Sequence, residues 1–187
     1  MKAKGFIGLV AFVGLVGLVV AATMAAGGDS SSKQKKPTPV RVGVYDSRAV
    51  AVAFVASGLF EKELQQWNQE KKEAKQEGNI KAAEKIDAKM LLRQKLVHHQ
   101  GFGTTSVENI LQHIHDQLPD IANKAGVDVI VSKWAIAYQA DQVEFVDVTD
   151  LMIEPFKPSE RTKAIIRDLR TKKPVDWEVI EKHDRDR

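Results

Sequence analysis

The sequence predicts an α+β fold: a small, mainly antiparallel sheet with a protruding antiparallel helical hairpin arm, preceded by an N-terminal hydrophobic helix. Three observations predict it. β-rich segments stand at both ends of the central region, residues 40–156. A highly charged stretch, whose few apolar residues have helical spacing, separates those segments. Residues 5–28 contain no charged residue, and such a run is long enough to cross ~30 Å of hydrocarbon as a helix.

The N-terminal run has the charge pattern of a membrane-targeting segment. Two lysines precede it and Asp29 follows it, so the positive-inside rule predicts a cytoplasmic N-terminus and a body on the far side of the membrane. The triplets at 23–25 and 25–27 are only rough versions of a cleavage site. Residues 1–28 are therefore a signal peptide or an uncleaved membrane anchor, and residues 29–39 are expected to form a disordered linker.

The composition excludes several kinds of chemistry. The chain has no cysteine, which rules out disulfides, thiolate metal sites, a cysteine nucleophile and lipid attachment through cysteine. The formal net charge is only +3, and much of the surplus lies near the ends of the chain. A nucleic-acid binder that uses the basic residues 33–36 is disfavoured by the export signal, and we expect no nucleic-acid partner.

The first half of the body is predicted to be one strand followed by the arm. Residues 40–45 alternate apolar and polar side chains, and Asp46 or Ser47 can cap the helix that follows. The turn residues at 77–79 place the tip of the hairpin. The return helix, 80–99, carries one apolar stripe, so the arm spans about residues 60–103.

The second half is predicted to close the sheet. A Ser/Thr-x-x-Glu capping box at 105–108 opens an amphipathic helix that runs from Val107 to Ala125, and Gly126 stops it. Three strands and a short helix follow, predicted at 127–131, 135–138, 142–148 and 151–156. Residues 157–187 form a polar C-terminal extension with two short helices, which we expect to lie outside the core.

Three closing motifs carry a resemblance to a known family. They are the hydrophobic strand 127–131, the Ala-Ile-Ala-Tyr segment 135–138 and Asp147-Val148-Thr149 ahead of the last helix. In this order, after a strand and a long helical excursion, they resemble the Skp/OmpH family of periplasmic chaperones over residues 40–156. The resemblance implies a homotrimer whose sheets join in a central body, with helical arms that hold unfolded outer-membrane proteins.

The candidate site residues lie on the predicted arm and sheet. Client binding is assigned to Leu64, Trp67, Met90 and Phe102, and the oligomer interface to Val42, Val44, Ile136 and Tyr138. For Trp67 the favoured alternative is packing in the seam of the hairpin, because the ring shares a stripe with its neighbours. The histidine pairs at 98–99 and 113–115 do not share a helix face, so no metal site and no cofactor are expected.

The function predicted from these patterns is that of a non-enzymatic periplasmic protein. No phosphate-binding loop, nucleophile elbow or His-Glu-x-x-His helix indicates an enzyme class. The leading hypothesis is a holdase-type chaperone that binds unfolded or partner polypeptides through its arms. The alternative is a structural adaptor that uses the same arms to bind one folded partner. The protein is either soluble after signal cleavage or anchored to the inner membrane.

Overall fold

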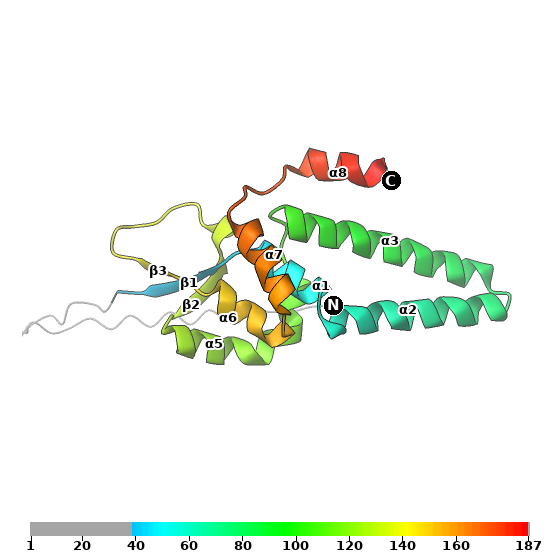
Figure 1. Ribbon diagram of the computed structural model, residues 1–187, viewed down its shortest axis with the longest axis horizontal. Coiled ribbons are helices and arrows are strands. Elements are labelled where there is room, and N and C mark those ends of the chain that lie inside the picture. Colours follow the sequence, from blue (N-terminus) through cyan, green and yellow to red (C-terminus); the bar gives the residue numbers. More distant parts are fainter. Residues whose placement is uncertain (1–38, 187) are drawn as a thin grey trace, which may run out of the picture. The chain divides into compact units, whose positions relative to one another are not determined.

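The computed structural model describes residues 39–186 (Figure 1). The predicted N-terminal hydrophobic helix and nearly all of the predicted linker lie outside the described residues. Among the residues that are described, no helix is both long and apolar enough to cross a membrane. The described residues form one unit with a single hydrophobic core.

The sheet has three strands in the order β2-β1-β3. The central strand β1, Arg41–Tyr45, pairs in parallel with β2, Val129–Ser132, and with β3, Glu144–Asp147. The prediction that the two distant β-rich regions meet in one sheet is confirmed, but the prediction of a mainly antiparallel sheet is wrong. Long connections separate β1 from β2 and β2 from β3, and such connections allow the chain to return to the same end of the sheet before each strand begins.

The predicted strand at 135–138 is also wrong. The chain instead forms a short 3₁₀ helix, η2, Lys133–Ala135, and then runs irregularly to β3. The hydroxyl of Ser132 accepts a hydrogen bond from the backbone N–H of Trp134 at 3.4 Å, which turns the chain away from the sheet. A strand at this point would have no place beside β1, because β2 and β3 already pair with both of its edges.

The predicted arm is confirmed. Helix α1, Ser47–Val55, leads into α2, Gly58–Gln76, and the return helix α3, Ile80–Phe102, packs along α2. Figure 1 shows α2 and α3 side by side, extending away from the sheet. Gly78 at the tip has a φ of 71°, which favours glycine because it has no Cβ. The tip therefore lies at residues 77–79, where the sequence predicts the turn.

The helix after the arm is broken where one continuous helix was predicted. It consists of α4, η1 and α5, which span Glu108–Leu111, Gln112–Gln117 and Leu118–Ala125. Pro119 explains the break, because proline has no N–H and its ring clashes with the carbonyl four residues earlier. The predicted stop is confirmed, since Gly126 caps α5 with a φ of 62°.

The C-terminal extension takes part in the core, contrary to expectation. Helix α6, Thr149–Ile153, and η3, Glu154–Phe156, are followed by α7, Glu160–Arg170, and α8, Trp177–Arg185. Ile166 of α7 is 1% exposed and belongs to the hydrophobic core. Thr162 and Ile166 are the buried residues of α7, which packs on α1, while Ile165 is 50% exposed.

A buried ion cluster joins the sheet to these helices. The carboxylate of Asp46 accepts hydrogen bonds from Arg48 Nε at 3.1 Å and Nη2 at 2.8 Å, and Lys133 Nζ lies 2.7 Å away. Its backbone N–H donates to Thr149 Oγ1 at 3.0 Å. Arg48 Nη1 donates to the carbonyl of Lys172 at 3.1 Å. Asp46, predicted as a helix cap, also accepts from the backbone N–H of Arg48 and so caps α1.

Ionised Asp46 is stabilised in this cluster. Burial by itself raises the pKa of the carboxyl group, but the hydrogen bonds and charges of Arg48 and Lys133 outweigh that effect, so the pKa lies below its ordinary value. Because the folded pKa is lowered, the carboxylate contributes its full stability above the unfolded pKa of about 3.9. That contribution is lost as the pH falls through the folded pKa.

We expect Asp46→Asn to lower the free energy of unfolding by about 3–5 kcal/mol at neutral pH, because it leaves the buried guanidinium of Arg48 unpaired. The difference from the wild type should shrink as the pH falls below about 3.9. Urea unfolding across this pH range measures both effects. Asp116→Asn, at a fully exposed carboxylate, is the matched control and should leave the free energy of unfolding unchanged. A pH-independent difference would contradict the assignment.

Candidate binding surfaces

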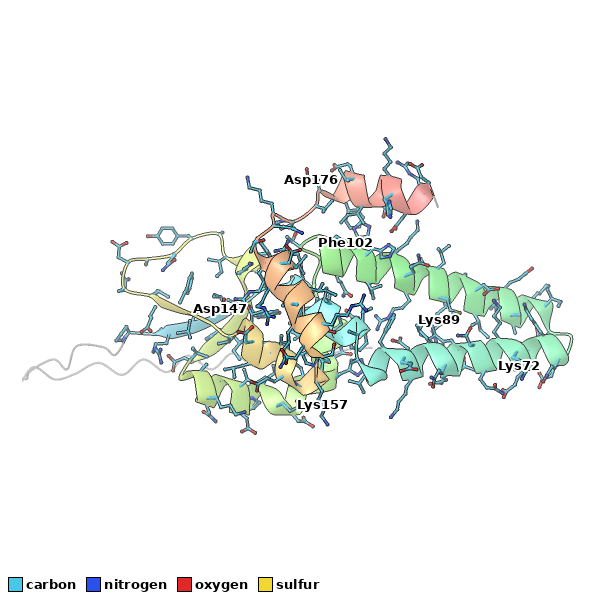
Figure 2. All side chains as sticks on the ribbon, in the orientation of Figure 1. Lys72, Lys89, Phe102, Asp147, Lys157 and Asp176 are labelled. Atoms are coloured by element: carbon cyan, nitrogen blue, oxygen red, sulfur yellow. The ribbon has the colours of Figure 1, made fainter. Side chains whose placement is uncertain are left out.

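The structure brings together two of the four predicted client-binding residues. Leu64 of α2 and Met90 of α3 both line a groove of about 450 Å³ along the arm, which Leu91 and Val97 also border. Both predicted residues are half-buried. Phe102 lies apart from them at the base of the arm, where its ring is 50% exposed (Figure 2).

Trp67 lies in the seam of the hairpin. Its side chain is only 7% exposed, and the ammonium group of Lys89 on α3 lies 4.2 Å from the centre of its ring. This position agrees with the alternative prediction, in which Trp67 packs in the seam of the hairpin. The ring therefore holds α2 against α3 instead of facing solvent.

Exposed leucines that were not assigned as site residues lie on α3. Leu91 is 55% exposed and Leu92 is 68% exposed. Neither leucine is a predicted site residue, because Leu91 falls in the apolar stripe that the sequence predicts to pack within the arm. A signal was present, since Leu91 and Leu92 follow Met90 directly and three consecutive residues cannot all face α2.

A second groove, about 360 Å³ in volume, lies at the base of the arm between α1, α3 and α7. Its lining is mainly apolar and includes Val55, Phe102 and Ile165, whose side chains are 40–50% exposed. Phe102, which was predicted to bind clients, thus lines this groove and not the one along the arm. Helix α8 lies close by, because the backbone N–H of Val175 donates to the carbonyl of Phe102 at 2.8 Å.

The predicted interface residues Val42 and Val44 share one face of the sheet. Residues that pair across parallel strands point to the same side, so the register places Val129, Val131 and Phe145 on this face as well. The opposite face packs on the core: a Cβ at Gly43 would lie only 3.0 Å from a methyl group of Val127. The first face is apolar except for Asp147, which pairs with Val44 in the register, and Val129 on it is 46% exposed.

The other two predicted interface residues are not on a strand. Ile136 and Tyr138 lie in the connection between η2 and β3, where Ile136 is half-buried and Tyr138 is 84% exposed. Ile136 and Tyr138 were assigned to the oligomer interface as residues of a strand, and that strand does not form.

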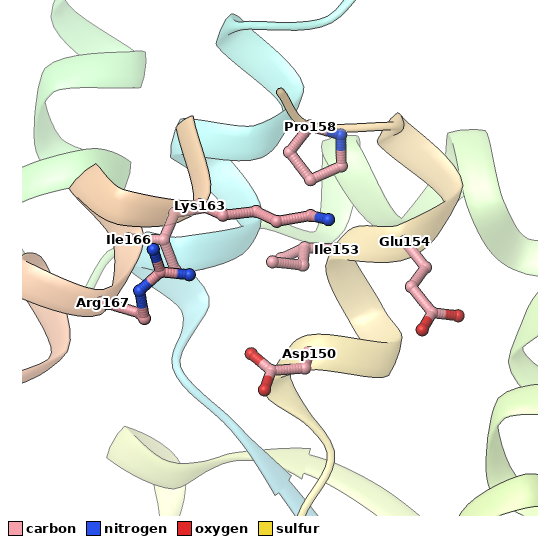
Figure 3. Close-up of a pocket in the computed structure, with 7 residues that line it drawn as sticks. All are labelled: Asp150, Ile153, Glu154, Pro158, Lys163, Ile166 and Arg167. Atoms are coloured by element: carbon pink, nitrogen blue, oxygen red, sulfur yellow. The ribbon is translucent and has the colours of Figure 1, made fainter. Parts of the chain in front are cut away.

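A small surface pocket of about 250 Å³ lies between α6 and α7 (Figure 3). Ile153 and Ile166 form part of its lining, and charged side chains surround them. Two of these charges already have partners, since Arg170 donates to Asp150 at 3.0 Å and Lys163 donates to Glu160 at 2.8 Å. The pair of Arg170 with Asp150 joins α7 to α6, whereas the pair of Lys163 with Glu160 lies within α7.

Three of the histidines take structural positions. His98 lies 2.6 Å from Asp184, and His99 lies 2.9 Å from Glu181, so both help to attach α8 to α3. His113 stacks on the ring of Phe54. Within residues 39–186, no group of three or more histidine and carboxylate side chains is placed to hold a metal ion.

Comparison with protein-family models, with curated proteins and with solved structures found no match to this chain.

We expect Trp67→Ala to lower the free energy of unfolding by about 3 kcal/mol, because it removes the largest buried ring of the hairpin seam. Leu92→Ala, at an exposed position of the same arm, should change it by less than about 0.5 kcal/mol. Urea unfolding followed by circular dichroism gives both values. Equal values for the two variants would show that Trp67 does not hold the seam.

Proposed function

We propose that this chain is an Skp/OmpH-like holdase of the cell envelope, which binds unfolded polypeptides with its projecting arm. The observation that carries the proposal is the groove along the arm, formed by Leu64 and Met90 and bordered by exposed Leu91. Apolar side chains of an unfolded chain gain free energy when they leave water for such a surface.

The form of the arm supports a holding role. Only Trp67 and Ala74 are buried on α2, and most of its other side chains are exposed and polar. Ion pairs join the two helices, including Arg93 with Glu63 at 2.9 Å. The arm thus keeps its shape through a narrow seam and leaves its outer surfaces available. A client bound there touches few residues that the fold itself requires.

The sheet supports assembly with further copies of the chain, and the resemblance to the Skp/OmpH family implies three copies. The face of the sheet opposite the core carries the valines 42, 44, 129 and 131 with Phe145 and Asp147, and none of these belongs to the core cluster of the described residues. The outer edges of β2 and β3 have no partner strand within residues 39–186. Apolar faces and open edges favour pairing with another chain. In a trimer, the three arms would project from one central body and surround a client.

We expect the purified body, from Lys33 onward, to suppress the aggregation of an unfolded outer-membrane protein at a near-stoichiometric ratio. Light scattering during dilution from urea measures the effect. The double variant Leu91→Gln and Leu92→Gln should protect several-fold less well, because it removes exposed apolar contacts from the arm. Val179→Gln, at a similarly exposed position on α8, should protect as the wild type does.

Two results would contradict the holdase. One is the absence of protection even at a large molar excess of the body. The other is cross-linking in cells that captures one folded partner in place of many clients, which would favour the adaptor.

We expect the native mass of the body, measured by light scattering after size exclusion, to be three times that of one chain. Val129→Lys should shift the mass toward the monomer, because it places a charge on the apolar face of the sheet. Val179→Lys makes the same change on α8 and should leave the mass unchanged. A monomeric wild type would overturn the proposed assembly.

A further inference from the structure

The groove along the arm and the groove at its base meet in one surface. Val97 of α3 lines both of them. The residues of α3 that line the two grooves recur at helical spacing and so lie on one side of the helix; they include Met90, Gln94, Val97 and Gly101. The opposite wall comes from α1 and α7 at the base and from α2 along the arm. From Asp87 to Phe102, the surface follows α3 for about four turns, or ~22 Å.

A third groove continues this surface toward the tip of the arm, and its lining is basic. It has a volume of about 410 Å³ and is lined by Asn68, Lys71, Lys72, Lys75 and Gln76 of α2. Lys71 forms an ion pair with Asp87, which lines the groove along the arm, so the two grooves adjoin. Figure 2 labels Phe102 near one end of the combined surface and Lys72 near the other.

The two outer lysines of this third groove are available to a partner. Lys72 and Lys75 are exposed, and neither forms an ion pair within residues 39–186. No carboxylate lines the groove beside them. Opposite charges across an interface favour association, so the end of an occupant that lies here should be acidic.

The titratable side chains along the apolar part of the surface already have partners. Asp87 and Arg93 each pair with a residue of α2, Arg93 with a glutamate at 2.9 Å. At the base, His98 lies 2.6 Å from Asp184. A charge of the occupant that is buried here would lose its hydration and find no free counter-ion. The buried side of the occupant must therefore be apolar and uncharged.

The walls of the surface favour a helical occupant over an extended one. They are formed by α1, α2, α3 and α7, and between their ends the main-chain N–H and C=O groups of α-helices bond within the helix. An extended segment would lose water from its own main-chain groups and find no main-chain partner, which costs free energy. A helix bonds these groups internally and presents its side chains to the groove.

We propose that this surface binds a segment of an unfolded client as an amphipathic helix of about four turns. An uncharged apolar stripe of the segment packs against α3, and acidic residues at one end lie near Lys72 and Lys75. The segment folds as it binds, so part of the contact free energy offsets its ordering. This mode of binding rests on the proposed function, since it requires that the arm holds polypeptides.

The test uses the body from Lys33 onward, whose hydrophobic core lies within the described residues. The probe is a synthetic peptide of about 18 residues, with leucines at the i, i+3, i+4, i+7 spacing and two glutamates in its last turn. Circular dichroism should show that the peptide gains helix when the body is added. A peptide of the same composition with alternating leucines should bind about tenfold more weakly, as measured by fluorescence anisotropy.

Charge reversal tests the basic end. Lys72→Glu with Lys75→Glu should weaken binding of the acidic peptide several-fold and strengthen binding of a peptide with two lysines in place of the glutamates. Lys81→Glu with Lys85→Glu is the matched control, because it makes the same change of charge at exposed positions of α3 that line none of the three grooves. It should leave both affinities unchanged.

A single substitution tests the base. Ile165→Gln, at a half-exposed residue of the groove between α1, α3 and α7, should weaken binding several-fold, because the helix spans both apolar grooves. Val179→Gln, at a similarly exposed position on α8, should not. Thermal unfolding checks that each variant is folded.

Aggregation of an outer-membrane protein is measured with the same samples, so that the two proposals fail separately. Protection without helix gain, with equal affinity for the two leucine patterns or with equal effects of the two lysine double variants, would overturn the helical mode and leave the holdase. Helix binding without protection would overturn the holdase and leave the surface as a site for a folded partner. Neither protection nor peptide binding would overturn both.

Discussion

The contact of Asp46 with Arg48 and Lys133 is the constraint on which the arrangement of the body depends. Both Asp46 and Arg48 are almost completely buried, so their charges must satisfy each other in a medium that solvates ions poorly. The cluster connects the end of β1 with α1, with η2 through Lys133 and with α6 through Thr149. The same guanidinium binds the carbonyl of Lys172. One side chain thus ties the C-terminal extension to the first helix.

The cluster also places the candidate surfaces. It holds η2 at the end of the sheet, where the ring of Trp134 lies 5.0 Å from the guanidinium carbon of Arg48. It fixes α1, from which the arm starts, and α1 contacts both α3 and α7 around the groove at the base of the arm. The arm beyond this groove depends on its own seam around Trp67. The body and the arm are therefore stabilised by different interactions.

The sequence predicted the arm better than the sheet. The tip at Gly78 and the seam position of Trp67 follow from turn chemistry and helical spacing, both of which act over a few residues. The direction of β2 and β3 does not follow from alternation, because parallel and antiparallel strands show the same pattern. Of the candidate site residues, Leu64 and Met90 line the same groove. Ile136 and Tyr138 lie in an irregular connection and not on the strand predicted for them. The exposed leucines of α3 could have been found from their consecutive positions.

By itself the sequence determined the local elements: the strand at β1, a cap at Asp46 or Ser47, the turn at Gly78 and the end of α5 at Gly126. Each depends on the backbone preferences of a few neighbouring residues. The tertiary structure alone decided the parallel pairing, the burial of Arg48 and the inclusion of Ile166 in the core. These features require contacts between distant segments, such as that of Arg48 with Lys172, 124 residues further along the chain. Local preferences carry no information about which distant residue will supply the partner.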